Sequence, residues 1–138
     1  MTRHMPPPRD GLWHVALNVA DVARAKAFYV DVLGFRLEWE PDADNVYLTS
    51  GRDNLALHRA PPGTALEGPG RLDHVGIVVP EARDVDAWEA HLRQHGVAVE
   101  RPTRTHRDGA RSLYARDPEG VLIQILFHPP ISSGARTP

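Results

Sequence analysis

The densest group of polar side chains in the sequence lies between positions 106 and 112, where the chain reads His-Arg-Asp-Gly-Ala-Arg-Ser. An arginine guanidinium can hold a carboxylate or phosphonate through two parallel hydrogen bonds, so Arg107 and Arg111 are candidate substrate-binding residues. The imidazole of His106 can give or take a proton, which makes His106 a candidate catalytic residue. The sequence leaves an alternative open, in which this is a solvated loop whose charges neutralise one another.

Two further histidines occupy matching places in two similar segments. His14 lies near the start of an apolar segment over 13–19, and His74 lies 60 positions later in a similar segment over 72–79. Alternating apolar residues are typical of a strand with one buried face, so His14 is expected on the face opposite to the apolar side chains. Imidazoles on such a face can ligate a metal, move protons or form hydrogen bonds within a pocket.

The elements that must position these side chains follow one order twice. In the first half we expect a strand over 13–19, a helix over 22–33 and strands over 35–39, 45–49 and 55–59. In the second half we expect a strand over 72–79, a helix over 84–95 and strands over 97–100, 110–115 and 121–127. Asp21 and Asp84 are expected to open the helices, and Gly34 and Gly96 to end them. The shared order indicates an internal duplication.

A segment rich in proline and glycine separates the two halves, with six such residues between positions 60 and 70. That composition is typical of a linker rather than a compact turn. The predicted organisation is a tail over 1–11, a first module over 12–60, a linker over 61–71, a second module over 72–128 and a tail over 129–138.

Length, charge and composition exclude several classes of protein. A chain of 138 residues can bury a core as one domain or as two half-domains. It contains no cysteine, which excludes disulfides, thiolate metal sites and cysteine nucleophiles. The net charge of −2 and the lack of long runs of like charge argue against nucleic acid as a partner. Because there is no signal-peptide pattern and no apolar run of about 18 residues, we expect a cytoplasmic protein without a membrane partner.

The arrangement of these motifs resembles the vicinal oxygen chelate superfamily, which includes glyoxalases, bleomycin-resistance proteins and extradiol dioxygenases. The resemblance extends from about Leu12 to His128, and the segments that carry it are His14–Asp21, Ala27–Tyr29, Val32–Phe35, His74–Val79 and Asp117–Gly120. It implies an α+β fold in which two βαβββ modules form a curved eight-stranded mixed sheet, with helices outside and an active-site cup on the concave face. Superfamily members often form homodimers, and some exchange modules between chains.

The resemblance also implies where a metal would bind, because metal-using members take ligands from the first and last strands of each module. The first-strand positions are His14 and His74. The last-strand positions are Ala56 and Gln124, where related enzymes carry glutamate. His58 lies two residues after Ala56, on the same side of its strand, and is a candidate third imidazole. The predicted ligands are therefore His14, His58, His74 and Gln124, and the candidate metals are Zn²⁺, Ni²⁺, Co²⁺, Mn²⁺ and Fe²⁺.

Two more side chains join the predicted site through the same resemblance. By comparison with fosfomycin-modifying relatives, Ser112 and Tyr114 would point into the cup, Ser112 to bind substrate and Tyr114 as a second candidate catalytic residue. The leading functional hypothesis is a metal-assisted, lyase- or isomerase-like enzyme that acts on a small oxygenated molecule. The alternative is a metal-free protein that binds a drug or metabolite. The missing glutamates favour this alternative, whereas the paired first-strand histidines oppose it.

Overall fold

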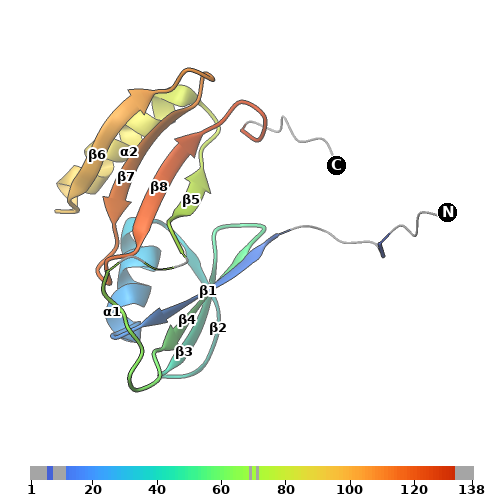
Figure 1. The fold of residues 1–138 in the computed structure, drawn as a ribbon, viewed down its shortest axis with the longest axis vertical. Coiled ribbons are helices and arrows are strands. Elements are labelled where there is room, and N and C mark those ends of the chain that lie inside the picture. Colours follow the sequence, from blue (N-terminus) through green and yellow to red (C-terminus); the bar gives the residue numbers. More distant parts are fainter. Residues whose placement is uncertain (1–5, 8–11, 69, 71, 133–138) are drawn as a thin grey trace.

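The computed structural model describes residues 6–7, 12–68, 70 and 72–132 (Figure 1). The elements are β1 (His14–Val19), α1 (Val22–Ala27), η1 (Phe28–Val32), β2 (Arg36–Asp42), β3 (Asn45–Thr49), β4 (Asn54–Arg59), β5 (Val75–Val78), α2 (Ala82–Gln94), β6 (Val99–Thr105), β7 (Arg111–Arg116) and β8 (Leu122–Phe127). This order confirms the predicted α+β class with two βαβββ modules. Most of the predicted N-terminal tail, and the C-terminal tail beyond residue 132, lie outside the described residues.

Each module forms its own four-stranded mixed sheet, with the strand orders β1-β4-β3-β2 and β5-β8-β7-β6. The first and last strands of each module pair in parallel, and the other neighbours are antiparallel. The eight strands are thus hydrogen-bonded as two sheets rather than as one continuous sheet (Figure 1). Strands β1 and β5 are consequently both edge strands, with one row of backbone groups facing away from their own sheet.

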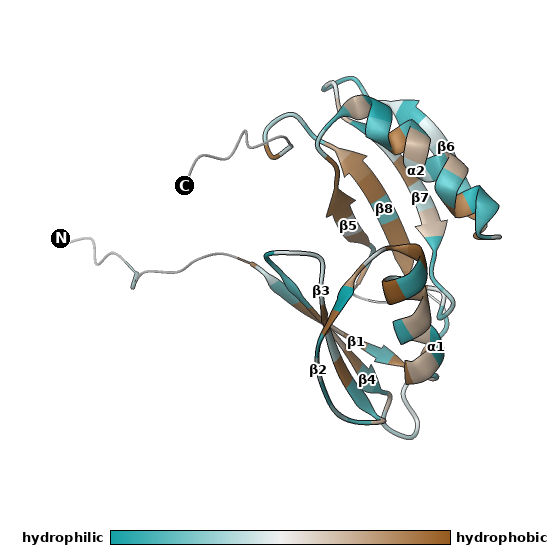
Figure 2. Ribbon diagram, turned by 180° about the vertical axis from the view of Figure 1, so that it is seen from behind, coloured by the Kyte–Doolittle hydropathy of each residue, from teal (hydrophilic) through white to brown (hydrophobic). Residues whose placement is uncertain are grey.

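One face of each sheet packs against helices, and the opposite face is left free. In β1 the side chains of Leu17 and Val19 are buried, whereas His14, Ala16 and Asn18 are exposed on the other face. Figure 2 shows how strongly apolar residues dominate β5 and β8 in the second module. Burial of these apolar side chains fixes the register of each strand, because a shift by one residue would turn every side chain to the opposite face.

The first helix departs from the prediction, because it does not continue as an α-helix to residue 33. The chain widens into the π-helix η1 at Phe28, and the backbone N–H of Leu33 donates to the Phe28 carbonyl at 3.2 Å. The wider turn allows the adjacent Phe28 and Tyr29 side chains, 7% and 0% exposed, both to enter the core. Gly34 follows with a φ of 77°, as expected for the residue that ends this segment.

The predicted start of the second helix is wrong by two residues. Helix α2 begins at Ala82 after Glu81, whereas Asp84 was expected to open it. Asp84 is instead the third residue of the helix, and its carboxylate accepts a hydrogen bond from the Glu81 backbone N–H at 2.9 Å. An acidic side chain three residues inside a helix can satisfy the N-terminal backbone in this way, so the two positions are hard to distinguish in sequence.

The outer strands β2 and β6 are longer than predicted, reaching Asp42 and Thr105. Each strand continues through a proline that lies beyond its predicted end, Pro41 in β2 and Pro102 in β6. Both are edge strands, where the missing N–H of proline can face away from the neighbouring strand without removing a ladder bond. Strand β6 also has a register irregularity between Arg101 and Arg104, which shapes the candidate site described below.

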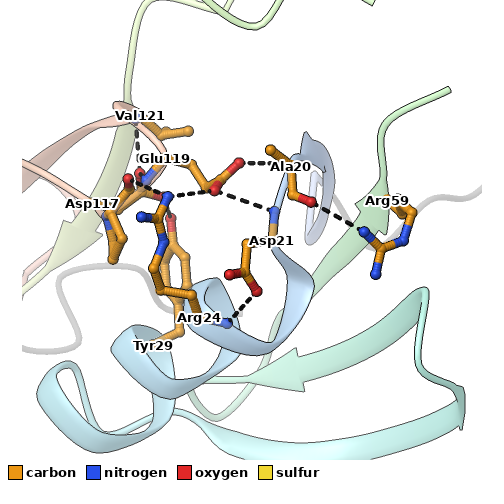
Figure 3. Close-up of polar contacts among 9 residues, drawn as sticks. Ala20, Asp21, Arg24, Tyr29, Arg59, Asp117, Glu119 and Val121 are labelled. Carbon is orange, nitrogen blue, oxygen red and sulfur yellow. Dashed lines mark hydrogen bonds and ion pairs between the residues drawn. The ribbon is translucent and has the colours of Figure 1, made fainter. Parts of the chain in front are cut away.

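A buried polar seam joins the two modules (Figure 3). The Tyr29 hydroxyl in η1 donates to the Asp117 carboxylate at 2.8 Å, and the backbone N–H groups of Glu119 and Val121 also donate to Asp117, each at 2.8 Å. Burial raises the pKa of Asp117 above its ordinary value, although these hydrogen bonds act in the opposite direction. Burial, together with the Asp117 charge, also raises the pKa of Tyr29.

Glu119 completes the seam from the same turn. Its carboxylate accepts hydrogen bonds from the backbone N–H groups of Ala20 and Asp21 at the start of α1, and from the Arg24 guanidinium at 2.9 Å (Figure 3). The Glu119 side chain is only 5% exposed, whereas that of Arg24 is 57% exposed. A carboxylate at the N-terminal end of a helix interacts favourably with its unpaired N–H groups. The seam therefore holds the second module against the first helix.

Candidate functional site

The free faces of the two sheets are called here the module-one face and the module-two face. The module-one face carries His14, Trp39, Asn45, Tyr47, Asn54 and His58. The module-two face carries His74, Arg101, Arg104, Ser112, Tyr114 and Gln124, with His106 and Arg107 in the turn beside it. In the described part of the chain, no helix has the length and apolar character to cross a bilayer.

Strand pairing shows that the two faces are equivalent positions of a duplicated unit. In module one, Ala56 lies beside Tyr47, and Tyr47 lies beside Trp39. In module two, Gln124 lies beside Tyr114, and Tyr114 lies beside Arg101. Each face therefore has a tyrosine at its centre, with a different residue covering it from the outer strand.

The module-one face is aromatic around its tyrosine. The Trp39 ring stacks on Tyr47 with centroids 5.1 Å apart, and the His58 ring meets Tyr47 edge-on at 5.7 Å. His58 Nδ1 lies 2.7 Å from Asn45 Oδ1, and His14 Nδ1 lies 2.7 Å from Asn54 Oδ1. Since an amide oxygen only accepts, each Nδ1 carries the hydrogen and each Nε2 keeps a free lone pair.

The predicted third imidazole does not lie beside the first. His14 pairs with Asn54 in the register of β1 and β4, whereas His58 pairs with Asn18. Four residues along a strand correspond to about 13 Å, which is too far for two imidazoles to share one metal ion. Because side chains alternate along β4, His58 lies on the same face as Ala56, as expected. The pairing of β1 with β4 nevertheless places it far from His14.

The module-two face holds a connected polar group. His74 Nδ1 lies 2.6 Å from the Asp73 carboxylate, and the His74 ring meets Tyr114 edge-on at 5.6 Å. Gln124 Nε2 donates to the Tyr114 hydroxyl at 2.9 Å, which leaves the hydroxyl hydrogen available to a ligand. The Arg101 guanidinium lies over the Tyr114 ring, 5.1 Å from its centroid, in a cation–π arrangement.

Beside this group lies a hollow of about 580 Å³. It is lined by Arg104, His106, Arg107, Asp108, Ala110, Gln124, Leu126 and His128. The turn that forms its rim depends on Gly109, whose φ of 86° is readily adopted only by glycine. His106 Nε2 lies 2.8 Å from the hydroxyl of the buried Ser112, so the structure brings together two residues predicted for the site.

The arginines of strands β6 and β7 and of the turn between them fall into two groups. Arg111 holds Asp86 of α2 through two hydrogen bonds of 3.0 and 2.6 Å, and Arg116 holds Glu100 at 2.5 and 3.2 Å. Among the described residues, Arg104 and Arg107 form no ion pair, although both line the hollow. Arg111 is therefore directed toward the helix, away from the hollow in which it was expected to bind substrate.

Whether a metal ion fits can be judged from the positions of the predicted ligands. His74 has the same free Nε2 as His14 and His58, because its Nδ1 is held by a carboxylate, an arrangement common for metal-binding histidines. The ligands are nevertheless divided between two sheets, and within the described residues no three His, Asp or Glu side chains lie close enough to hold one ion. The donor chemistry fits a divalent metal, but a single chain does not gather the donors.

Arg101 and Arg104 are the site residues that sequence reasoning missed. Simple alternation along β6 would place residues 101, 103 and 105 on one face and Arg104 on the other. The register irregularity between Arg101 and Arg104 changes this phase, so that Arg101 covers Tyr114 and Arg104 pairs with Ser112 on the same face. The sequence signal that could have suggested this irregularity is Pro102, which lies between them.

Two βαβββ modules with polar residues on their free faces define the class of protein. Residues 11–125 match the family model of the Glyoxalase/Bleomycin resistance protein/Dioxygenase superfamily. The chain belongs to this superfamily, and the resemblance found in the sequence is confirmed.

Individual relatives span several activities. The chain is 30% identical over 122 residues to a 2,2',3-trihydroxybiphenyl dioxygenase of Sphingomonas paucimobilis, covering 85% of this chain but only 41% of that protein. It is 31% identical over 127 residues to the protein YaeR of Escherichia coli (strain K12), covering 81% of this chain and 92% of YaeR. Among solved structures, a lactoylglutathione lyase from Agrobacterium tumefaciens matches with a TM-score of 0.72 and 25% identity, covering 88% of this chain and 96% of that one. The fold thus accompanies different reactions, and the site must indicate which chemistry this chain supports.

Proposed function

We propose that this chain binds a small oxygenated anion in the hollow of the module-two face and transfers a proton on it, in lyase- or isomerase-like chemistry. The observation that carries the proposal is the presence of two arginines, Arg104 and Arg107, which line the hollow and have no ion-pair partner among the described residues. A guanidinium forms strong charge-assisted hydrogen bonds with a carboxylate, phosphate or phosphonate group. An anionic ligand would give these two guanidiniums an ion-pair partner, because the Asp108 carboxylate that also lines the hollow accepts from the Ala110 backbone N–H and forms no ion pair with either arginine.

His106 and Tyr114 are proposed to act as the general base and general acid in this proton transfer. His106 lines the hollow, and its contact with the Ser112 hydroxyl orients the ring toward a ligand held by the arginines. The Tyr114 hydroxyl already accepts a hydrogen bond from Gln124, so its own hydrogen can be donated to a ligand oxygen. The imidazole lines the hollow, and the hydroxyl lies next to Gln124, which also lines it, so the two would supply a base and an acid to a ligand there.

Anion binding is tested by calorimetric titration with phosphate, methylphosphonate and pyruvate as probes. We expect the Arg104→Gln/Arg107→Gln variant to lose about 100-fold in affinity, because each charge-assisted hydrogen bond contributes about 1.5–3 kcal/mol. Arg52→Gln is the matched control, since it also removes positive charge but lies in the turn before β4, where its guanidinium covers Trp13. Wild-type affinity in the double variant would overturn the proposal.

The alternative function is binding without turnover, as in a drug- or metabolite-binding protein. It is supported by Ala56 and Gln124 at the last-strand positions, where a carboxylate would be expected in a metal-dependent relative. The two functions are separated by incubating the tightest ligand with wild-type protein and recovering it for mass spectrometry. If it is converted, His106→Gln should lower kcat by about 100-fold or more, whereas recovery of unchanged ligand would support the binding function.

A second candidate is a metal site shared between two copies of the chain. His14 and His74 occupy equivalent places in their modules, and each keeps a free Nε2. His14 lies in the edge strand β1, and His74 directly precedes the edge strand β5. Four exposed apolar side chains lie in or next to these strands, namely Leu12, Trp13, Leu72 and Val78. A homodimer that covers these edges would bring His14 of one copy toward His74 and Gln124 of the other. The cytoplasmic location and the homodimer expected from the sequence are parts of this proposal.

The shared site has a specific test. Metal content by elemental mass spectrometry should be lower than in the wild type by about one divalent ion per chain in both His14→Ala and His74→Ala homodimers. When the two variants are co-expressed, a site shared between copies should reappear once per heterodimer, because one of its two sites then has both histidines. Failure of the heterodimer to regain metal would exclude the shared arrangement.

A further inference from the structure

A second cluster of imidazoles lies on the outer side of the molecule, away from both free faces. His91 is in the last turn of α2, and His95 is the residue that caps its C-terminal end. Their ring centroids are 4.3 Å apart, the closest approach of any two aromatic rings that the described residues contain. Neither residue has a part in the function proposed above.

Hydrogen bonds to backbone carbonyls fix which nitrogen of each ring carries the hydrogen. His91 Nε2 lies 2.8 Å from the carbonyl of Val32 in η1, and His95 Nδ1 lies 2.9 Å from the carbonyl of His91. A carbonyl oxygen only accepts, so these two nitrogens are the donors. Nδ1 of His91 and Nε2 of His95 therefore keep free lone pairs. Metal-binding histidines commonly show this pattern, in which the second ring nitrogen donates to a carbonyl or carboxylate.

Three further features favour a cation at this place. Residues four apart on a helix lie on one face, so the two rings are held side by side by the helix itself. The C-terminal end of a helix carries partial negative charge, which attracts cations. An ion about 2 Å from one nitrogen of each ring is compatible with rings this close together. The nearest carboxylate in the same turns, Glu89, already holds the Thr103 backbone N–H at 2.7 Å and Arg93 at 3.4 Å.

We propose that His91 and His95 form a binding site for one borderline-soft divalent cation, such as Zn²⁺, Ni²⁺ or Cu²⁺, for which imidazole is a preferred ligand. No third His, Asp or Glu joins the pair in the part of the chain that the structure describes, so water completes the coordination shell. This site is independent of the shared site at His14 and His74.

The position of the pair gives the site a structural consequence. His91 joins α2 of module two to η1 of module one through its bond to Val32. A cation on Nδ1 withdraws charge from the ring and makes the Nε2–H a stronger donor to that carbonyl. Cation binding should therefore strengthen the contact between the two modules and raise the thermal unfolding temperature, because the ion binds the folded helix and not the unfolded chain.

The test is a titration of untagged, full-length protein with Zn²⁺, followed by amide NMR and by thermal unfolding. We expect saturable shifts in the last turn of α2 and around Val32, together with a higher unfolding temperature. His95→Gln should weaken this Zn²⁺ binding by about tenfold or more, since it removes one of the two ligands while its amide can still donate to the His91 carbonyl. Its unfolding temperature without metal should match that of the wild type.

His74→Gln is the control, because it removes an imidazole from the module-two face and leaves the α2 pair intact. It should keep the Zn²⁺-dependent shifts in α2 and the thermal stabilisation. The proposal is overturned if His95→Gln binds Zn²⁺ with wild-type affinity, or if millimolar Zn²⁺ produces no saturable change at the end of α2. Loss of the α2 shifts in His74→Gln would also overturn it, since it would place the ion elsewhere.

Discussion

The two free faces share one backbone plan but differ in what surrounds the central tyrosine. In module one, Trp39 stacks on Tyr47. In module two, the Arg101 guanidinium covers Tyr114, and two more arginines line the adjoining hollow. Around its central tyrosine, one face is therefore aromatic, whereas the other carries arginines. After duplication, replacement of a few outer-strand and turn residues is sufficient to give two faces with different side-chain chemistry.

The turns before the last strands differ in the same way. In module one, Asp53 accepts hydrogen bonds from its near neighbours Thr49 and Ser50. In module two, Asp117 accepts from its own turn and also from Tyr29, 88 positions away. The first turn closes a local loop, whereas the second joins the modules. Equivalent turns can thus have a local role in one half and a long-range role in the other.

The largest predicted effect is on the free energy of unfolding, and it tests the difference between these two turns. We predict that Asp117→Ala lowers the free energy of unfolding by about 3 kcal/mol, because it leaves the buried Tyr29 hydroxyl and two backbone N–H groups without their acceptor. Asp53→Ala should lower it by about 1 kcal/mol, because its partners can bond to water instead. Urea unfolding of both variants measures the difference. Equal losses of unfolding free energy would show that the contacts of Asp117 between the modules stabilise the fold no more than the local contacts of Asp53.

The next effect concerns the residues that cover the two tyrosines. We predict that Arg101→Trp, which copies the module-one arrangement, weakens anion binding about fivefold, because a positive charge near the hollow is lost. The reverse change, Trp39→Arg, should not create an anion site in module one, because the carboxylates of Asp42 and Glu38 already bind Asn45 and Asn54 on that face. Calorimetry with phosphate compares the two variants. An unchanged affinity in Arg101→Trp would show that Arg104 and Arg107 act alone.

A smaller effect is expected in the pH dependence of stability. Because burial raises the pKa of Asp117 above its ordinary value of 3.8, the folded state binds this proton more tightly than the unfolded state. The stability that protonated Asp117 contributes is therefore fully present below pH 3.8 and is lost as the pH rises through the folded pKa. Relative to Asp117→Asn, the wild type should gain stability as the pH falls from neutral toward 3.8. If the stability difference between the wild type and Asp117→Asn stays constant with pH, or changes in the other direction, the pKa of Asp117 is not raised in the folded state.

The smallest effect on anion binding is expected at Arg111. It tests whether the arginines held in ion pairs are separate in function from those that line the hollow. Because Arg111 is bound to Asp86 on α2, Arg111→Ala should change anion affinity by less than about twofold. Its free energy of unfolding should fall by at most about 1 kcal/mol, as is usual for a solvent-exposed ion pair. Titration and urea unfolding of the same variant measure both quantities. A large loss of anion affinity would indicate that Arg111 binds the anion after all.

The strands and their buried faces could be predicted from local patterns. Alternation in β1 correctly placed Leu17 and Val19 in the core and His14 on the free face. His106 and Ser112, which were each predicted for the site, lie 2.8 Å apart. The ends of β2 and β6 were predicted less well, since Pro41 and Pro102 are compatible with a strand only if that strand lies at a sheet edge.

By itself the sequence determined the duplicated order of elements, the buried face of each strand and the family, because these depend on periodicity and on residues close together in the chain. Only the tertiary structure decided which side chains from distant segments meet. Strand register separated His58 from His14, an irregularity in β6 brought Arg104 onto the face of Arg101, and Asp117 met Tyr29 across the two modules. The physical reason is that such contacts depend on how strands pair and modules pack, and no local pattern of residue types specifies that geometry.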